Sequence, residues 1–341
     1  MTGESMRDPT RMNRLQGAQG SAQRTEPLSI GKLTVLMVSY NTRELVLRAV
    51  RSLYDNAGYP FELIVIDNAS DDGSGAAISS EFSSVKVIQS GVNLGFAAAN
   101  NEAVKKAQGN VLLFLNPDTE VLPGAIRELM MFRHRNLDAR IWGGRTVYGD
   151  GRPNPSSCWR RQTLWGLLVQ ALGLSALCRS CQFLNPERVF ELEQSESCRV
   201  DIVSGCFLLI DKEFFLRLGG FSSRFFMYGE DADLCLRAES KGARACVTSR
   251  ATIIHHGGAS ERVAAEKLIR LLKAKVTLII MHFTPGTRGI ALVLLSAWPF
   301  SRMLAHWVLS ILGVRRYAIT AAVWKEVWGR RKEWLEGFPP E

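Results

Sequence analysis

Three carboxylates fall within four positions of the sequence, at Glu230, Asp231 and Asp233, directly after Gly229. Repulsion between crowded carboxylates tends to raise the pKa of at least one of them, and apolar neighbours add to this effect. A carboxylate with a raised pKa can take a proton from a substrate hydroxyl near neutral pH. The segment is therefore a candidate for a general base, although a solvated, acidic helix start would contain the same residue types.

We expect a helix to begin in this acidic segment and to continue through Leu234, Leu236 and Ala238. The first two carboxylates would then lie at the helix N-terminus, where backbone N–H groups favour negative charge. Asp233 and Arg237 are four residues apart and can pair along one face of the helix. Helix capping alone would explain these residues equally well, so the surrounding elements have to decide between the two interpretations.

Short apolar runs alternate with segments of helical period along most of the chain. Such alternation predicts an α/β fold with a Rossmann-like, mostly parallel central sheet and helices on both of its faces. The predicted strands are residues 33–38, 61–66, 85–88, 111–115, 202–210 and 251–254. The predicted helices of this region include residues 44–55, 97–107, 164–177 and 212–218, the third being either a helix or a flexible insert.

Polar clusters follow three of these strands, at residues 39–42, 67–74 and 116–119. In open α/β sheets, ligands bind at the carboxyl ends of the strands. Such residues could instead cap the next helices, but three clusters on one edge, two of them with a carboxylate, favour a nucleotide site. The sequence contains neither Gly-x-Gly-x-x-Gly nor Gly-x-x-x-x-Gly-Lys-Ser/Thr, which argues against a dinucleotide fold and a P-loop NTPase.

The composition is that of a globular protein with a basic balance. The 341 residues are 46% hydrophobic and 22% charged, with a formal net charge of +9. The basic residues form no dense run with interleaved aromatics, which argues against nucleic-acid binding and favours a phosphate-bearing substrate or an anionic membrane surface. The seven cysteines are irregularly spaced, so they predict free thiols rather than a disulfide framework or a zinc site.

A series of short motifs makes the chain, from about residue 33 to residue 260, resemble the family 2 inverting glycosyltransferases of the glycosyltransferase-A fold. It looks most like their bacterial rhamnosyltransferase branch. The motifs are Val38-Ser39-Tyr40-Asn41, Val65-Ile66-Asp67-Asn68-Ala69-Ser70, Asn93-Leu94-Gly95-Phe96, Leu115-Asn116-Pro117-Asp118, Val203-Ser204-Gly205, Tyr228-Gly229-Glu230-Asp231-Ala232-Asp233-Leu234 and His255-His256-Gly257-Gly258. Their order and spacing are specific for the superfamily and less informative about the sugar.

The resemblance implies a site for a nucleotide-diphosphate sugar at the strand ends. Asp67 would bind the base of the nucleotide, with Ser39 and Asn41 beside it. Asn93 and Gly95 would contact the nucleotide sugar. The full set that the resemblance implies for the donor is Ser39, Asn41, Asp67, Asn93, Gly95, Asn116 and Asp118.

The resemblance also implies a divalent metal ion. Asp118 occupies the last position of the family's Asp-x-Asp metal motif, whereas Asn116 and Pro117 fill its other places. One histidine of the following pair, His255 rather than His256, would be a second metal ligand. Mg²⁺ accepts one or two carboxylates together with phosphates and water, and a histidine ligand favours Mn²⁺.

Asp231 would be the catalytic base of such an enzyme, as the resemblance implies. Glu230 and Asp233 would hold the acceptor or tune Asp231. Gly205 and Trp142 are further candidates for contacts with the acceptor. The base would remove the acceptor proton while the acceptor oxygen attacks the anomeric carbon from the face opposite the leaving diphosphate, which inverts that centre.

We expect three regions along the chain. Residues 1–30 would be a disordered basic tail without the apolar segment of a secretory signal. Residues 31–262 would be the catalytic domain, with a nucleotide-sugar-binding half at 31–140 and an acceptor-binding half at 141–262. Residues 263–341 would form amphipathic or hydrophobic helices, with Trp, Lys and Arg side chains suited to a membrane interface. A docked subdomain or a homo-oligomer contact would explain the same helices.

The leading hypothesis is a glycosyltransferase that lies in the cytoplasm, peripheral to the inner face of the cell membrane. It would move a sugar, L-rhamnose from dTDP-rhamnose as the best guess, to a lipid-linked or polysaccharide acceptor in cell-envelope glycan synthesis. A UDP- or GDP-sugar is the alternative donor. Alternatives of another class are a sugar-phosphate nucleotidyltransferase and an inactive, membrane-docked scaffold that binds nucleotide sugars.

Overall fold

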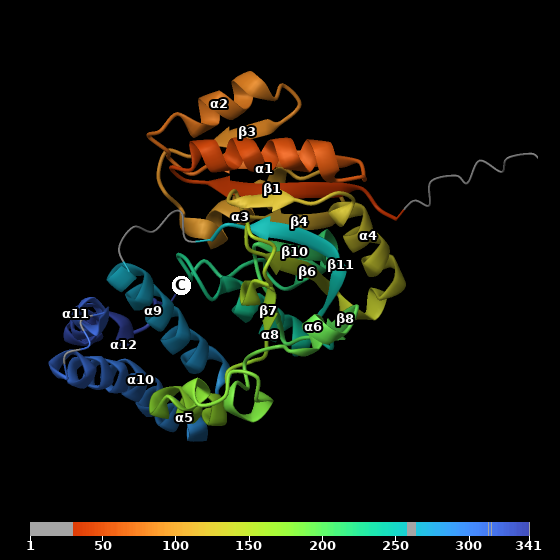
Figure 1. Cartoon of the computed structure of the whole chain (residues 1–341). Helices are drawn as coiled ribbons and strands as arrows, with labels where there is room; N and C mark the ends of the chain where they lie inside the picture. The colour runs from red at the N-terminus through yellow and green to blue at the C-terminus, as the bar shows by residue number, and fades with distance from the viewer. Residues whose placement is uncertain (1–29, 258–263, 313, 315, 341) are drawn as a thin grey trace, which may run out of the picture. The chain divides into compact units, whose positions relative to one another are not determined.

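The buried apolar strands form one central sheet (Figure 1). The computed structural model describes residues 30–257, 264–312, 314 and 316–340, so the predicted basic tail lies, apart from Ile30, outside the described residues. Within the described part, nine strands pair in the order β3-β2-β1-β4-β10-β6-β11-β5, with β8 pairing with β11. These strands are β1 (Leu33–Ser39), β2 (Phe61–Asp67), β3 (Lys86–Gln89), β4 (Val111–Leu115), β5 (Thr119–Val121), β6 (Ile141–Val147), β8 (Ser197–Arg199), β10 (Phe207–Asp211) and β11 (Cys246–His255).

The sheet is mixed but mostly parallel, as predicted. Strand β1 runs parallel to β2 and β4, and β2 runs parallel to β3. Strand β10 is antiparallel to both β4 and β6, so β6 and its parallel neighbour β11 point the same way as β4. Strands β5 and β8 run antiparallel to β11. The carboxyl ends of six strands therefore lie at one edge.

Helices cover the sheet because its strands are apolar on both faces, as expected for a buried parallel sheet. Alternate residues of β1, β2, β4 and β10 pack with α3, α7 and α8 in one large core cluster. Helix α1 contacts β5, and α4 contacts β6 and β11. The helices up to this point are α1 (Arg43–Asn56), α2 (Ser74–Glu81), α3 (Gly95–Lys106), α4 (Ala125–Arg135), α5 (Leu164–Leu172), α6 (Glu191–Gln194), α7 (Lys212–Arg217) and α8 (Glu230–Glu239).

The predicted strand at residues 202–210 is split in two. Its first part, β9 (Ile202–Val203), pairs with β7 (Cys158–Trp159) in a separate small sheet. Its second part, β10, belongs to the central sheet. The residues between them leave both ladders, because the N–H of Gly205 donates to the Asp231 side chain rather than to a strand. The apolar pattern alone does not reveal this break.

Strand β6 was not predicted, since Trp142-Gly143-Gly144 looks like turn chemistry. The structure buries both glycines in the middle of the sheet. A Cβ on Gly144 would come within 2.3 Å of the Ala251 carbonyl oxygen and of the Phe207 ring. Glycine is therefore required here because neighbouring strands approach closely, which is a common reason for glycine inside a strand.

The C-terminal region is helical, as expected, and packs as a group with α5 (Figure 1). Its shared core contains Leu167 of α5 and residues of every C-terminal helix, among them Leu272, Leu295, Trp324 and Trp334. Helix α9 also contacts α8 of the sheet region. These helices are α9 (Ala264–His282), α10 (Pro285–Ile311), α11 (Arg316–Gly329) and α12 (Arg331–Leu335).

Helix α10 is long and apolar enough to cross a membrane, judged by length and composition within the described residues. Only 11% of its most apolar window is buried. Residues 31–341 form one compact unit. The predicted boundaries between residues 140 and 141 and between residues 262 and 263 stay predictions.

Replacing Gly144 with alanine should destabilise the protein. The added methyl group would collide with backbone and ring atoms that cannot rotate away, and such overpacking costs about 1–3 kcal/mol. Gly91→Ala is the matched control, because a Cβ there would meet nothing within 4 Å. Urea denaturation of both variants measures the difference, and equal midpoints for Gly144→Ala and the unaltered protein would contradict the described packing.

Candidate functional site

The end of β2 forms the first part of the candidate site. Asp67 lies directly opposite Ser39, the last residue of β1. One oxygen of the Asp67 carboxylate accepts from the Ser70 N–H at 3.1 Å, and the other accepts from the Gly75 N–H at 3.1 Å. The Ser39 hydroxyl is fully buried and bonds to the hydroxyl of Thr42 at 3.0 Å. Each carboxylate oxygen of Asp67 keeps a second lone pair for a ligand, whereas the Ser39 hydroxyl faces inward.

Asn41 lies in the adjoining loop and adopts φ of +52°, a left-handed conformation that asparagine tolerates. Its side chain accepts from the Asp71 N–H at 2.9 Å, and its own N–H donates to the hydroxyl of Ser70 at 3.0 Å. The loops after β1 and β2 are thereby fastened together, and the exposed Asn41 stays beside Asp67.

Asn93 and Gly95 are held next to Asp67 by Asn68, a residue to which we had assigned no role. The Asn68 amide donates to the Asn93 side chain at 2.9 Å and to the Gly95 carbonyl at 3.3 Å, and its oxygen accepts from the Leu94 N–H at 2.9 Å. Gly95 has φ of +75°, and a Cβ there would lie 2.2 Å from the Phe226 carbonyl oxygen. The position of Asn68 directly after Asp67 in the sequence is the signal that could have identified it as a site residue.

The segments that carry Asp118, Gly205 and His255 meet at the same edge of the sheet. Leu115, which ends β4, pairs with Phe207 at the start of β10, so Gly205 lies just beyond this pair. The Asn116 N–H donates to the carbonyl of the residue after Gly205 at 3.2 Å. His255 ends β11, and the N–H of the next residue donates to the Asp118 carbonyl at 3.0 Å.

Asp118 and His255 face each other with 3.4 Å between the carboxylate Oδ1 and the imidazole Nε2. Burial alone would raise the pKa of Asp118, but the facing His255 lowers it below its usual range. Burial alone would lower the pKa of His255, but Asp118 and the Cys206 side chain raise it to about 10. Without a cation, the Asp118 carboxylate is therefore balanced by the protonated His255, and a cation that binds both side chains would replace the proton of His255.

The residues around Asp118 fit a divalent cation. His255 Nδ1 and Asn116 Oδ1 are buried and have no hydrogen-bond partner among the described residues. A carboxylate and an imidazole that already point at each other are suitable ligands for Mg²⁺ or Mn²⁺. No group of three or more His, Cys, Asp and Glu side chains within the described ranges could hold a metal. A cation here would need donor phosphates or water to complete its coordination.

Glu230 and Asp231 form the buried acidic pair at the start of α8. An Asp231 oxygen accepts from the Gly205 N–H at 2.9 Å. Burial raises the pKa of Asp231, although backbone hydrogen bonds from Gly205 and Ala232 oppose the shift. Burial and the neighbouring Asp231 charge raise the pKa of Glu230 well above its usual range. Glu230 Oε2 is buried without a partner among the described residues. Burial thus raises the pKa of both acids, and Asp231 also accepts a hydrogen bond from a distant segment that opposes the shift.

Asp233 has a different environment from its two acidic neighbours. It is fully buried, and its Oδ1 accepts from His282 Nε2 at 2.9 Å. Its Oδ2 accepts from the Arg237 guanidinium, with Nε at 2.8 Å. Burial alone would raise the pKa of Asp233, but these two partners lower it. Both oxygens are occupied, so the structure leaves Asp233 no open contact with an acceptor.

Gly205 and Trp142, the other candidates for acceptor binding, lie in different places. Gly205 packs beside Phe96 and Asp231, since a Cβ there would meet them at 3.4 and 3.6 Å. Trp142 is fully buried, and its indole N–H donates to the Asn136 carbonyl at 2.8 Å. Because the Trp142 ring belongs to the core under α4, the structure gives it no surface for an acceptor.

The segment that contains Asp231 contacts the segment of Asn93 and Gly95 at the start of α3. The Phe96 N–H donates to the Phe226 carbonyl at 2.9 Å. Phe226 lies in the loop that leads into Glu230 and Asp231, and the Phe96 ring packs beside Gly205. The segments that contain Asp67, Asp118 and Asp231 are therefore connected along one edge of the molecule by hydrogen bonds.

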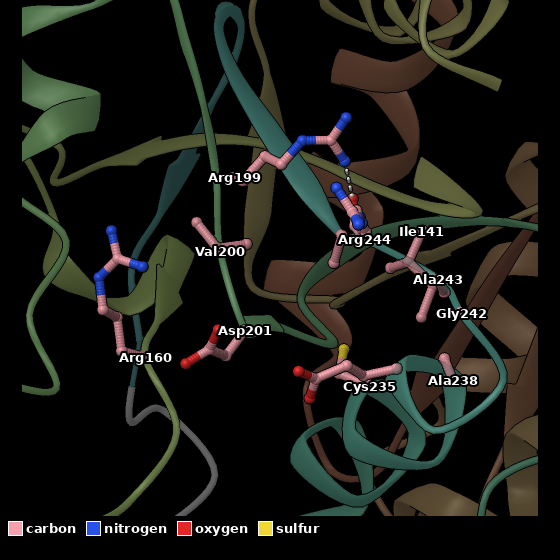
Figure 2. A pocket seen from close by; sticks show the side chains of 12 residues that line it. Ile141, Arg160, Arg199, Val200, Asp201, Cys235, Ala238, Gly242, Ala243 and Arg244 are labelled. Carbon is pink, nitrogen blue, oxygen red and sulfur yellow. Dashed lines mark hydrogen bonds between the residues drawn. The ribbon is translucent and has the colours of Figure 1, made fainter. Parts of the chain in front are cut away.

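A separate cavity of about 440 Å³ lies near the other end of α8 (Figure 2). Arg160, Arg199, Arg244 and Asp201 line it together with Cys235. Arg199 already pairs with Asp138 and with a backbone carbonyl, and Arg160 pairs with Glu191. None of the predicted site residues lines this cavity.

Comparison with known proteins identifies the family. The sequence profile of glycosyl transferase family 2 matches residues 34–219, more than half of the chain. A second profile, described as the N-terminal domain of galactosyltransferase, matches residues 195–258. The chain therefore belongs to glycosyltransferase family 2 and is an enzyme that transfers a sugar, as the motifs predicted.

Two curated relatives have names that describe sugar transfer. An N-acetylglucosaminyl-diphospho-decaprenol L-rhamnosyltransferase of Mycobacterium tuberculosis is 28% identical over 235 residues, which are 66% of this chain and 76% of the relative. A low-salt glycan biosynthesis hexosyltransferase of Haloferax volcanii is 28% identical over 211 residues, which are 60% of this chain and 61% of the relative.

Solved structures confirm the glycosyltransferase-A fold. A mannosyltransferase of Pyrobaculum calidifontis in complex with GDP-Man and Mn²⁺ matches with a TM-score of 0.56 at 17% identity, covering 87% of this chain and 85% of that chain. GalNAc-T7 with UDP, GalNAc and Mn²⁺ matches with a TM-score of 0.53 at 17% identity, covering 73% of this chain and 48% of that chain.

The buried Glu230 should make stability depend on pH. Its pKa is raised in the folded protein, so its contribution is complete below the unfolded value of 4.5 and is lost as the pH rises through the folded pKa. Glu230→Gln stays neutral and should lose less stability over that interval. Urea denaturation of both proteins across this pH range measures the difference, and parallel curves would contradict the buried position of Glu230.

Proposed function

We propose that this glycosyltransferase moves a sugar from a nucleotide-diphosphate donor to a hydroxyl of a lipid-linked or polysaccharide acceptor, with inversion. The observation that carries the proposal is the buried Asp231 carboxylate, held by the Gly205 N–H at the sheet edge where Asp118 and His255 also lie. Our choice of donor is dTDP-rhamnose, which the similarity to an L-rhamnosyltransferase supports. The process would be cell-envelope glycan synthesis.

In this reaction Asp231 accepts the proton of the acceptor hydroxyl. The acceptor oxygen forms its bond to the anomeric carbon while the bond from that carbon to the diphosphate breaks on the opposite face, so the centre inverts. A raised pKa suits Asp231 to this role, and a base of this kind contributes about 10²–10⁴-fold. Glu230, whose pKa is raised by burial, would hold the acceptor through its unpartnered Oε2.

The donor would lie along the strand ends. Asp67 would accept from the nucleotide base, with Asn41 beside it, and the loop of Asn93 and Gly95 would contact the nucleotide sugar. Ser39 would act indirectly, because its hydroxyl is buried and bonds to Thr42. It would fix Thr42 and the loop after β1. Asn116 would contact the donor from the loop after β4 through its unpartnered Oδ1.

Asp118 and His255 would hold Mg²⁺ or Mn²⁺ against the donor diphosphate. The bound cation would neutralise the negative charge that develops on the leaving diphosphate. The two protein ligands leave room for phosphate oxygens and water, as such cations require. The Mn²⁺ in the two solved structures of this fold supports this assignment.

The C-terminal helices would place the enzyme on the cytoplasmic face of an anionic membrane, where a lipid-linked acceptor is found. Residues 263–341 contain twelve Lys and Arg against five Glu, and positive charge attracts anionic lipid. Along α10, the exposed apolar side chains lie mostly three, four or seven residues apart, which is typical of one face of a helix lying in a membrane interface. They are Ile290, Val293, Phe300, Leu304, Trp307, Val308 and Ile311.

The catalytic proposal is tested with purified protein, Mn²⁺ or Mg²⁺, a panel of dTDP-, UDP- and GDP-sugars and a lipid-linked or saccharide acceptor. We expect nucleoside diphosphate release and an inverted glycosidic product with one donor, and loss of turnover with chelator. Asp231→Asn should lower kcat by about 10²–10⁴-fold and still bind the donor.

Three results would contradict the catalytic proposal. Pyrophosphate release from a sugar phosphate and an NTP would indicate a nucleotidyltransferase instead. Donor binding without transfer to any acceptor would indicate a nucleotide-sugar-binding scaffold. Full activity of Asp231→Asn would exclude Asp231 as the base.

The membrane proposal is tested by flotation with vesicles that contain or lack anionic lipid. We expect binding that strengthens with anionic lipid and weakens with salt, and that falls when Val293 and Trp307 are both changed to Ser. Leu137→Ser, which removes an exposed apolar residue from the sheet region, should bind as the unaltered protein does. Absence of vesicle binding, together with a dimer that the double variant dissociates, would show that the α10 face is a homo-oligomer contact.

A further inference from the structure

The catalytic helix α8 is fastened to the C-terminal region by a buried hydrogen bond. His282, the last residue of α9, donates from Nε2 to Asp233 Oδ1 at 2.9 Å. Asp233 is fully buried, whereas the His282 side chain is 21% exposed. The bond joins residues 49 positions apart in the chain. It therefore fixes the position of α8 relative to α9 and is not a contact within one helix.

The other oxygen of Asp233 extends the same connection into the sheet region. It accepts from Arg237, whose guanidinium also donates to the Leu218 carbonyl at 2.6 Å and the Gly220 carbonyl at 2.9 Å. Asp233 is therefore the junction between α9 on one side and the loop after α7 on the other. Both of its buried oxygens are paired, and a satisfied polar network helps to define a unique arrangement of its elements.

The loop before α8 is held from the same side. The Phe225 ring packs on the Phe338 ring with 6.0 Å between centroids, and Arg224 donates to the Phe338 carbonyl at 3.0 Å. The Phe338 N–H in turn donates to the Thr277 hydroxyl of α9 at 2.8 Å. A Cβ on Gly229, the residue before Glu230, would lie 3.2 Å from Ala274 of α9. Helix α9 therefore packs directly under the start of α8.

Asp231 itself has few restraints. Its carboxylate accepts from the Gly205 N–H and from the N–H of the next residue, Ala232, within its own helix. The position of this carboxylate thus follows the position of the first turn of α8. Asp233 lies in that turn, two residues after the base and one residue before Leu234, which anchors the helix in the core.

We propose that His282 is a positioning residue for the transfer reaction: through Asp233 it sets the first turn of α8, and with it the direction of the Asp231 carboxylate. Because Asp231 acts as the base in the proposed transfer, this role of His282 rests on the proposed function. The C-terminal helices would then be part of the catalytic unit as well as a docking surface. A misplacement of about 1 Å in a reacting group can cost about 10²-fold in rate.

The test is a matched pair of amide substitutions, His282→Gln and His282→Asn. The glutamine amide nitrogen reaches the place of Nε2 and can donate to Asp233, whereas the asparagine amide is too short. We expect His282→Gln to keep kcat within about threefold and His282→Asn to lose about tenfold to a hundredfold in kcat. The KM and the binding stoichiometry of the donor should stay unchanged in both, because the donor residues lie on other elements.

Controls separate positioning from general destabilisation. His134→Asn changes a histidine in the last turn of α4 and should leave kcat unaltered. In an Asp233→Ala background, which lacks the acceptor, His282→Asn should have no further effect on kcat, since two residues that act through one contact are not additive. Unaltered kcat in His282→Asn would overturn the role of His282, and so would equal losses in His282→Gln and His282→Asn.

The outcome for the unaltered protein is read separately. If it transfers sugar and His282→Asn does so equally well, only the positioning role fails. If it transfers no sugar with any donor and acceptor, the proposed function fails, and the positioning role fails with it. A reduced donor stoichiometry that accounts for the whole loss of kcat in His282→Asn would also overturn the role, because the defect would then be misfolding.

Discussion

The free-energy cost of burying two adjacent carboxylates is the main physical constraint at the start of α8. Glu230 and Asp231 are almost completely removed from water, and an unpaired buried charge is expensive. Hydrogen bonds offset this cost more for Asp231 than for Glu230. Asp231 accepts from the Gly205 N–H, while Glu230 Oε2 has no partner among the described residues. The pKa of both acids is raised, and backbone hydrogen bonds from Gly205 and Ala232 oppose the shift of Asp231. Gly205 lies at the break between β9 and β10.

The third acid of the segment shows how a motif residue can serve the structure. Both oxygens of Asp233 accept hydrogen bonds, one from Arg237 and the other from His282, so its charge is neutralised inside the protein. The C-terminal helices supply one of these partners and also pack under the loop before α8. The C-terminal helices are therefore joined to the acidic start of α8 through a contact between α8 and α9.

Much of the fold could be predicted because buried parallel strands are continuous apolar runs. The runs at β1, β2 and β4 are present at almost the predicted bounds, and the polar residues after them lie at one edge. Strand β6 could not be predicted, since its glycines serve close packing against Phe207 and Ala251, a requirement set by neighbouring strands. Trp142 was a candidate for acceptor binding, but the structure buries its ring and its indole N–H donates to the Asn136 carbonyl.

By itself, the sequence determined the family, the mostly parallel sheet and the acids that could do chemistry, because these depend on residue type and local spacing. Only the tertiary structure decided the environment of each acid. The raised pKa of Glu230, the pairing of Asp118 with His255 and the burial of Asp233 depend on how the chain packs around them. Burial and the partners within a few ångströms set the free energy of a charge, and neither quantity is present in the order of residues around it.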